Sequence, residues 1–226
     1  MCGIAGILVS SPLDGAAQQT LPVMLRALRH RGPDDSGMWT APGSHAALAH
    51  ARLSIIDLSP AGHQPMSTPD GRLTIVFNGE IYNHRGLRTG LEARGVAFRS
   101  NSDTEVILRA YEAYGTECVA KLRGMFAFAL WDERERSCLF ARDAFGIKPL
   151  YLAERDGRLV FASEVRALIA SGLVSRELDP VGVHGYFRTG SVPEPRTLLK
   201  DVRCLPAGHW ARWRAGRLDA RRYWTL

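Results

Sequence analysis

The sequence has few cysteines for its length, and they do not cluster. Cys2, Cys118, Cys138 and Cys204 are far apart in 226 residues, and no pair has C-x-x-C spacing. This pattern argues against a disulfide framework or a structural zinc site. The seven histidines form no i, i+4 pair and no grouping with carboxylates. We therefore expect no metal site, and a reducing cytoplasm in which free thiols persist.

Long hydrophobic runs are also absent. No apolar stretch approaches 18 residues, so we expect no membrane-spanning segment. The apolar run at the N-terminus is short and lacks a basic flank, which excludes a signal peptide. With 46% hydrophobic and 23% charged residues, the composition is typical of a soluble globular protein of one large or two small domains.

The net charge of +6 raises the question of an acidic partner. No zinc-finger spacing, RNA-binding strand motif or heptad repeat accompanies it, so we expect no nucleic-acid partner. We interpret the one loose basic cluster as a solvated edge. It consists of Arg212, Arg214, Arg217, Arg221 and Arg222.

Short apolar runs bounded by turn residues predict a series of strands. They are Gly3–Val9, Ala46–Ile56, Leu73–Phe77, Met125–Trp131, Ser137–Arg142, Leu150–Glu154 and Leu159–Ala162. The segments Asp132–Arg136 and Arg155–Arg158 read as hairpin connections, the second with the strong turn signal Asp156-Gly157. Strands joined so tightly must be antiparallel.

Helices are fewer. Apolar spacing predicts helices over Thr20–Arg29, Arg85–Arg94 and Glu164–Ala170. Ser102-Asp103-Thr104-Glu105 is a capping box that begins a helix through about Tyr114, and Asp179-Pro180 begins a further short one. Helices inserted between antiparallel strands predict an α+β layered fold.

Cys2 directly follows the initiator Met. Cysteine is small enough for the Met to be removed in the cell, which would free the α-amino group of Cys2. An α-amine has a pKa of about 7.7–8.0, so it could act as general base for the thiol of the same residue. The alternative is that residue 2 simply leads into a strand.

Asn78-Gly79-Glu80 follows the predicted strand Leu73–Phe77. We expect this segment at a strand end, where an Asn amide and a following backbone N–H can stabilise one developing negative oxygen. Asn-Gly is also a common tight turn, which stays the alternative.

Two charged residues have ambiguous surroundings. Arg52 lies in an apolar run, where its planar fork suits a carboxylate, either of a ligand or of a structural ion pair. Asp103 lies in the first turn of its helix, where it could cap the helix or accept hydrogen bonds from a ligand's ammonium group.

Several motifs, in order along nearly the whole chain, resemble the glutaminase domain of glutamine-hydrolysing asparagine synthetases. They are Met1-Cys2-Gly3-Ile4-Ala5-Gly6, His30-Arg31-Gly32-Pro33-Asp34, Arg52-Leu53-Ser54-Ile55-Ile56-Asp57, His63-Gln64-Pro65-Met66, Asn78-Gly79-Glu80-Ile81-Tyr82-Asn83, Ser102-Asp103-Thr104-Glu105 and Gly146-Ile147-Lys148-Pro149-Leu150-Tyr151. The resemblance implies a fold of the N-terminal nucleophile class, an αββα sandwich with two antiparallel sheets between helical layers.

The resemblance also implies roles for individual residues. Cys2, once Met1 is removed, corresponds to the nucleophile, and Asn78 and Gly79 correspond to the oxyanion hole. The glutamine-binding residues implied are Arg52 for the α-carboxylate, Glu80 and Asp103 for the amino end, and Leu53 and Ile55 as pocket wall.

Residues 1–226 are thus expected to form one glutaminase domain that hydrolyses L-glutamine to glutamate and ammonia without a cofactor. Family members continue into a synthetase domain that uses ATP and Mg, and its Ser-Gly-Gly-x-Asp-Ser loop is absent from this sequence. The expected partner is a synthetase domain or partner subunit that receives the ammonia, with a homodimer left open. Two alternatives remain, a silent glutamine-sensing or partner-binding module and a hydrolase acting on another amide.

Overall fold

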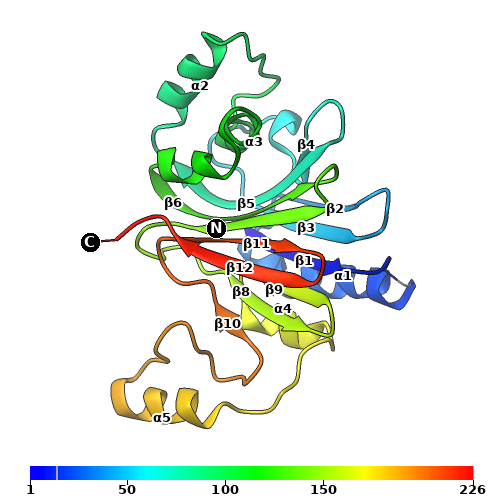
Figure 1. The fold of residues 1–226 in the computed structure, drawn as a ribbon, viewed down its shortest axis with the longest axis vertical. Coiled ribbons are helices and arrows are strands. Elements are labelled where there is room, and N and C mark those ends of the chain that lie inside the picture. Colours follow the sequence, from blue (N-terminus) through cyan, green and yellow to red (C-terminus); the bar gives the residue numbers. More distant parts are fainter. Residues whose placement is uncertain (14, 226) are drawn as a thin grey trace.

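The computed structural model describes residues 1–13 and 15–225, which form two stacked six-stranded sheets (Figure 1). All strand pairs within the sheets are antiparallel. The first sheet has the order β10 (Arg203–Cys204), β8 (Tyr151–Arg155), β9 (Arg158–Ala162), β1 (Gly3–Val9), β3 (Ala46–Arg52), β2 (Asp35–Thr40). The second has the order β12 (Arg217–Arg222), β11 (His209–Arg214), β7 (Ser137–Arg142), β6 (Gly124–Asp132), β5 (Leu73–Ile81), β4 (Met66–Ser67).

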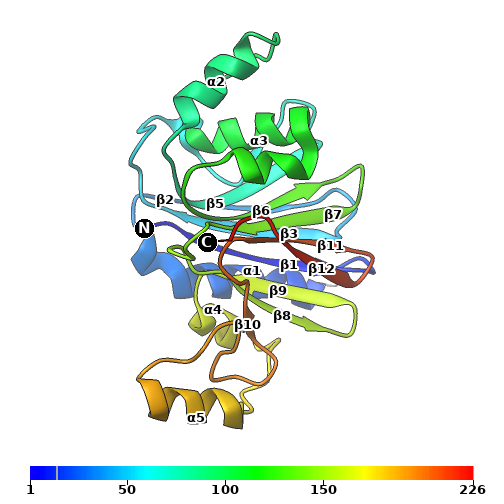
Figure 2. The same cartoon turned by 60° about the vertical axis from the view of Figure 1, so that its left-hand side comes forward.

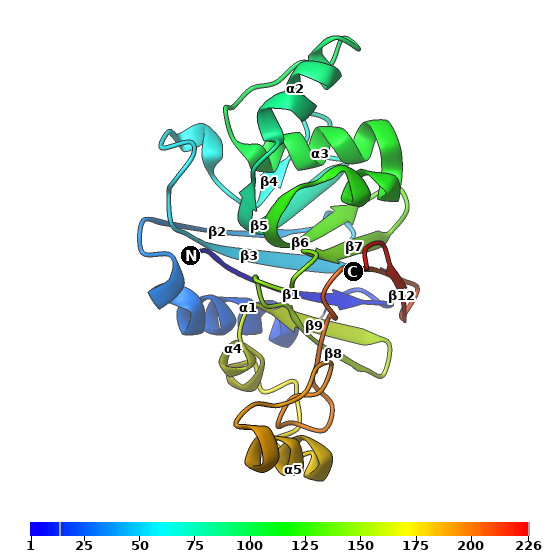
Figure 3. The ribbon, with the colours of Figure 1, turned by 90° about the vertical axis from the view of Figure 1, so that its left-hand side faces the viewer.

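Helices cover the outer face of each sheet, as Figures 2 and 3 show from two further sides. The α-helices are α1 (Gly15–Leu28), α2 (His84–Glu92), α3 (Asp103–Tyr114), α4 (Val165–Ala170) and α5 (Pro180–Thr189). Short 3-10 helices span Arg29–Arg31, Pro60–Gly62 and Gly115–Lys121. Helices α1 and α4 pack on the first sheet, α3 packs on the second with α2 beside it, and α5 lies beyond β10. The predicted αββα sandwich is confirmed.

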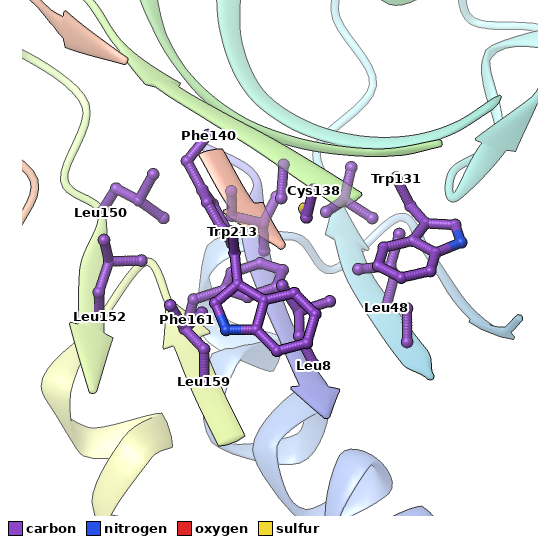
Figure 4. Packing of buried hydrophobic residues seen from close by; sticks show 14 of the residues in the cluster. Leu8, Leu48, Trp131, Cys138, Phe140, Leu150, Leu152, Leu159, Phe161 and Trp213 are labelled. Carbon is purple, nitrogen blue, oxygen red and sulfur yellow. The ribbon is translucent and has the colours of Figure 1, made fainter. Parts of the chain in front are cut away.

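The layer between the sheets is the main core (Figure 4). Because side chains alternate along a strand, one set of residues from each strand faces the opposite sheet. Ile4 and Leu8 of β1, Leu48 of β3 and Val76 of β5 belong to this set. The residues between them face the helices instead, in two further buried clusters. Alternation therefore decides which side chains meet between the sheets.

Both predicted hairpins are confirmed, because Asp132 pairs with Ser137 and Arg155 pairs with Arg158. The predicted strand Ala46–Ile56 is too long, since β3 ends at Arg52. Beyond it the chain turns away, and Asp57 accepts hydrogen bonds from the backbone N–H and the hydroxyl of Ser59.

The predicted end of a strand at Phe77 is wrong, because β5 continues to Ile81. Its pairing with β6 continues to the same residue, so Asn78 and Gly79 lie inside a strand. The turn alternative for this dipeptide is therefore wrong as well.

The capping box is only half correct. Ser102 caps α3 by accepting a hydrogen bond from the N–H of Thr104. Glu105 instead accepts hydrogen bonds from the backbone N–H groups of Arg99 and Ser100. Its carboxylate therefore fixes the preceding loop rather than the helix start.

The sequence patterns predicted seven of the twelve strands in the described residues, and they missed β2, β4, β10, β11 and β12. The exposed edge strand β12 carries part of the basic cluster, which agrees with a solvated edge. No α-helix in residues 1–13 and 15–225 is long and apolar enough to cross a bilayer.

His50 links the two sheets near the end of the core. It is fully buried on β3, and its Nε2 lies 3.0 Å from the carbonyl oxygen of Phe77 on β5. A carbonyl only accepts hydrogen bonds, so Nε2 carries the proton. Burial lowers the pKa of His50 to about 4 from the ordinary 6.5. The ring is therefore neutral near neutral pH.

This buried histidine makes stability depend on pH. In the unfolded chain His50 becomes protonated below about pH 6.5, whereas in the folded chain it stays neutral down to about pH 4. The free energy of unfolding should therefore fall over this window, by about 3 kcal/mol in total. Urea unfolding at pH 7 and pH 4.5 should show a smaller loss for His50→Gln than for wild type. An equal loss in both proteins would contradict this assignment.

Candidate active site

A cavity of about 130 Å³ opens at the end of the inter-sheet layer where β1 begins and β3 ends. A cavity of about 150 Å³ suffices for benzene in another protein, so this one can hold part of a small molecule. All eight predicted site residues line it, namely Cys2, Arg52, Leu53, Ile55, Asn78, Gly79, Glu80 and Asp103.

Strand alternation explains why these distant residues meet. Cys2 lies two residues before Ile4 of the inter-sheet core, and Asn78 lies two residues after Val76. Arg52 lies four residues after Leu48 of the same core. Each polar side chain therefore continues a row of apolar side chains, at the point where the row leaves the core.

The Cys2 thiol is half-buried and touches the start of the loop after β3. Its Sγ lies 3.6 Å from the carbonyl oxygen of Leu53, and the Leu53 N–H donates to Sγ at 3.4 Å. The guanidinium of Arg31 donates to the Cys2 carbonyl at 2.8 Å, which fixes the backbone there. Burial raises the pKa of the Cys2 thiol, although Leu53 and Arg52 oppose the rise. The thiol therefore needs a base to become a nucleophile.

The edge of β5 beside this thiol lacks a strand partner. Strand β4 has two residues, and its pairing with β5 extends only to Ile75. In an antiparallel sheet the backbone groups of alternate residues point to the same side. The N–H of Phe77 and that of Ile81 point to the open side, where they donate to Gln64 and Asp103. The same alternation directs the N–H of Gly79, midway between them, to the cavity.

Asn78 carries the second donor at this place. Its side chain is only 1% exposed, yet its Nδ2 has no hydrogen-bond partner within the described residues. A buried amide without a partner costs about 1–3 kcal/mol, so native proteins rarely keep one without a reason. A ligand oxygen in the cavity would satisfy it.

Gly79 is required by close packing. A Cβ on this residue would lie 2.3 Å from the carbonyl oxygen of Met125 on the neighbouring strand. No side chain fits there without moving backbone. The glycine thus permits β5 and β6 to stay paired beside the cavity.

Arg52 is held in the cavity wall by carbonyl groups. Its guanidinium donates to the backbone oxygens of Asp57 and Ser59, the second at 3.2 Å. Its nearest carboxylate, Asp35, is 4.0 Å away and accepts a shorter hydrogen bond from His63. A structural ion pair is therefore weak, and the positive charge remains available to an anionic ligand group.

Two carboxylates complete the wall. Asp103 is buried, and its Oδ2 accepts a hydrogen bond from the N–H of Ile81 at 2.9 Å. Burial raises the pKa of Asp103. An ammonium group placed beside it would favour the ionised form again. Glu80 lies on the same face of β5 as Asn78 and also lines the cavity.

Sequence reasoning gave no role to several other lining residues. Lys148 is buried beside the cavity, and its Nζ donates to the Sδ of Met1 at 3.0 Å. Gln64 is buried and contacts both Phe77 and Thr104. Both residues lie in motifs that resemble the family, but only the folded structure shows that they line the same cavity as Cys2. Ile55, by contrast, is 62% exposed and lies at the rim.

The described residues contain no group of three His, Cys, Asp or Glu side chains that could hold a metal ion. The cavity itself contains a thiol, amide donors and charged groups. A thiol near the chain start, two N–H donors and groups of both charges in one cavity fit the expectation of an amide-cleaving or acyl-transfer class of site.

Comparison with known proteins agrees with this class. Residues 1–224 match the family described as the glutamine amidotransferase domain, and the chain belongs to that family. It is therefore an enzyme domain, and the resemblance noted in the sequence is confirmed.

Two curated relatives are asparagine synthetases by name. The chain is 41% identical over 210 residues to asparagine synthetase [glutamine-hydrolyzing] 1 of Bacillus subtilis, covering 92% of this chain and 33% of that protein. It is 42% identical over 236 residues to a putative asparagine synthetase [glutamine-hydrolyzing] of Mycobacterium bovis, covering 96% and 36%. The chain thus spans about a third of the length of these relatives.

A solved structure shares the fold. The glutamine phosphoribosylpyrophosphate amidotransferase of B. subtilis superposes with a TM-score of 0.74 and 20% identity. The match covers 100% of this chain and 50% of that one. At this identity the likeness concerns the fold alone.

The packing at Gly79 yields a direct prediction. Gly79→Ala should lower the free energy of unfolding by about 1–3 kcal/mol, because the added methyl group collides with the backbone of Met125. Gly90→Ala in helix α2 is the matched control, since a Cβ there meets nothing within 4 Å. It should raise stability slightly. Denaturant unfolding of both variants tests the assignment, and equal effects would refute it.

Proposed function

We propose that this chain hydrolyses L-glutamine to L-glutamate and ammonia through a thioester on Cys2. The observation that carries the proposal is the buried, unpartnered amide of Asn78 in the cavity that also contains the Cys2 thiol. A donor without a partner beside a nucleophile is what a tetrahedral oxyanion requires. Membership of the glutamine amidotransferase family supports glutamine as the substrate.

The charged groups of the cavity match the α-amino acid end of glutamine. Arg52 offers donors to the α-carboxylate, while Asp103 and Glu80 offer acceptors to the α-ammonium group. Leu53 and Ile55 provide the wall beside the thiol and at the rim. Groups of opposite charge in one cavity can bind a zwitterion in one orientation.

Catalysis requires removal of Met1, which lines the cavity and whose thioether contacts Lys148. Removal both enlarges the cavity and frees the α-amine of Cys2. In its neutral form this amine takes the thiol proton. The thiolate then attacks the side-chain carbonyl carbon of glutamine, and the carbonyl electron pair moves to the oxygen, which binds the Asn78 amide and the Gly79 N–H.

Collapse of this intermediate breaks the C–N bond. The protonated amine gives its proton to the leaving nitrogen, which departs as ammonia and leaves a glutamyl thioester. Water then attacks the thioester carbonyl and gives a proton to the amine. A second collapse breaks the C–S bond, and the returned proton regenerates the thiol while glutamate leaves.

The ammonia is proposed to serve amidation of a carboxylate. The similar proteins of B. subtilis and M. bovis are named as asparagine synthetases, and their remaining length offers room for a synthetase domain. In this proposal that domain, or a partner subunit, uses ATP and Mg and receives the ammonia. The thiol chemistry suits a reducing compartment such as the cytoplasm.

A chain that retains Met1 would behave differently. Its Cys2 nitrogen is an amide without basicity, and burial keeps the pKa of the thiol raised. Such a chain would be the silent glutamine-binding module. The intact mass of the protein decides which form a sample contains.

Cys2→Ala should abolish ammonia release from glutamine, because the variant lacks the thiol that attacks the amide. The fold should persist, so the melting temperature should change little. Cys118→Ala is the control, since burial raises the pKa of that thiol to about 12 and it lies outside the cavity. Undiminished ammonia release from Cys2→Ala would refute the proposal.

Arg52→Ala should raise KM for glutamine about 10- to 100-fold, the loss of one charge-assisted contact, with a smaller effect on kcat. Arg72→Ala is the matched control, because Arg72 pairs with Asp132 at the other end of β5. Steady-state kinetics compare the two variants. An unchanged KM for Arg52→Ala would exclude a carboxylate-binding role.

A further inference from the structure

The backbone just before Asn78 is held by two side chains that come from different parts of the fold. His50 of β3 donates from Nε2 to the carbonyl oxygen of Phe77 at 3.0 Å. Gln64 accepts a hydrogen bond from the N–H of Phe77 at its Oε1, at 2.7 Å. These two groups of Phe77 lie where β4 would continue if it were longer. Side chains thus replace a missing strand.

Both side chains are themselves fixed. Gln64 is 5% exposed, and its Nε2 donates to the hydroxyl of Thr104 in α3 at 3.1 Å. The backbone of Gln64 packs closely against Gly37 of β2. A Cβ on Gly37 would lie 2.2 Å from the carbonyl oxygen of Gln64. His50 is fully buried and pairs in the sheet with Gly37 on one side and Ile4 on the other. These contacts fix His50 and Gln64, so neither side chain can move along with β5 if that strand shifts.

We propose that His50 and Gln64 are positioning residues of the oxyanion site, which hold the peptide groups of Phe77 and so orient Asn78 and Gly79. This inference rests on the proposed function of that site. The carbonyl that His50 binds belongs to the peptide unit that joins Phe77 to Asn78. A rotation of this unit would turn the Asn78 side chain and shift the Gly79 N–H.

Such a role has a kinetic signature. The oxyanion donors act mainly in the transition state, so their displacement lowers kcat more than it changes KM. A displacement of about 1 Å can cost on the order of 100-fold in rate. We therefore expect His50→Leu and Gln64→Leu each to lower kcat by about 10- to 100-fold, with KM for glutamine changed by less than about threefold.

A glutamine analogue with an aldehyde in place of the amide provides a second readout. Addition of the Cys2 thiol to this aldehyde forms a hemithioacetal whose oxygen lies where the oxyanion would lie. Its inhibition constant should rise by the same factor as kcat falls. The inhibition constant of glutamate, the product, should stay within about threefold because it does not depend on a tetrahedral oxygen.

Two variants separate positioning from simple loss of stability. His50→Gln keeps an N–H donor at a similar reach and should restore most of kcat. Thr74→Val changes the same strand β5 away from the cavity, where it removes the part-buried hydrogen bond from Thr74 to Ser67 of β4. It should lower the melting temperature without lowering kcat. The proposal would be overturned if both leucine variants kept the wild-type kcat and the wild-type inhibition constant of the aldehyde. It would also be overturned if His50→Gln did not restore kcat.

Nuclear magnetic resonance tests the positions of Asn78 and Gly79 independently of catalysis. The side-chain amide signals of Asn78 and the N–H signal of Gly79 should move in both leucine variants and stay in place in Thr74→Val. Absence of ammonia release from the wild-type protein would refute the proposed function, whereas unmoved signals would refute the positioning role. The spectra also identify any variant that fails to fold, in which case the other leucine variant decides.

Discussion

The open edge of β5 is the constraint on which the rest of the site depends. Strand β4 is two residues long, so the backbone groups of β5 beyond Ile75 have no strand partner on that side. Buried backbone groups need partners, and the fold supplies side chains at Phe77 and Ile81. Gly79 lies between these two satisfied positions. Its N–H is directed at the cavity, so the interrupted sheet leaves a backbone donor open to a ligand.

Electrostatics at this edge follow from burial. The cavity wall contains Arg52, whose hydrogen-bonded partners are backbone carbonyls, and Asp103, whose pKa burial raises. The Cys2 thiol likewise has a raised pKa. A buried acid and a buried thiol both resist ionisation until a suitable charge arrives. An incoming ammonium group and a free α-amine would supply what each of them lacks.

Much of the fold could be predicted because strand alternation and hairpin turns are local properties. The pairings Asp132 to Ser137 and Arg155 to Arg158 follow from the turn segments alone. The missed strands are those whose formation depends on distant partners. Strand β12, for example, is mostly polar and exists because β11 pairs with it along its whole length.

The site was predictable in its members and less so in its geometry. Motif resemblance identified eight residues that line one cavity. The apolar run Leu73–Phe77 placed Asn78 at a strand end, whereas β5 continues to Ile81 because its pairing with β6 continues to Gly124. Gln64, His50 and Lys148 received no role because their importance comes from contacts across 13 to 147 residues of chain. Such contacts have no local signature.

The central claim is that Cys2, with its α-amine free, is the nucleophile toward the amide end of glutamine. The most direct test is intact and peptide mass spectrometry after treatment with a diazoketone analogue of glutamine, on protein with Met1 removed and on protein with Met1 retained. The account predicts one adduct, on Cys2, formed rapidly only without Met1 and suppressed by excess glutamine. An adduct on another residue, or equal labelling of both forms, would contradict it.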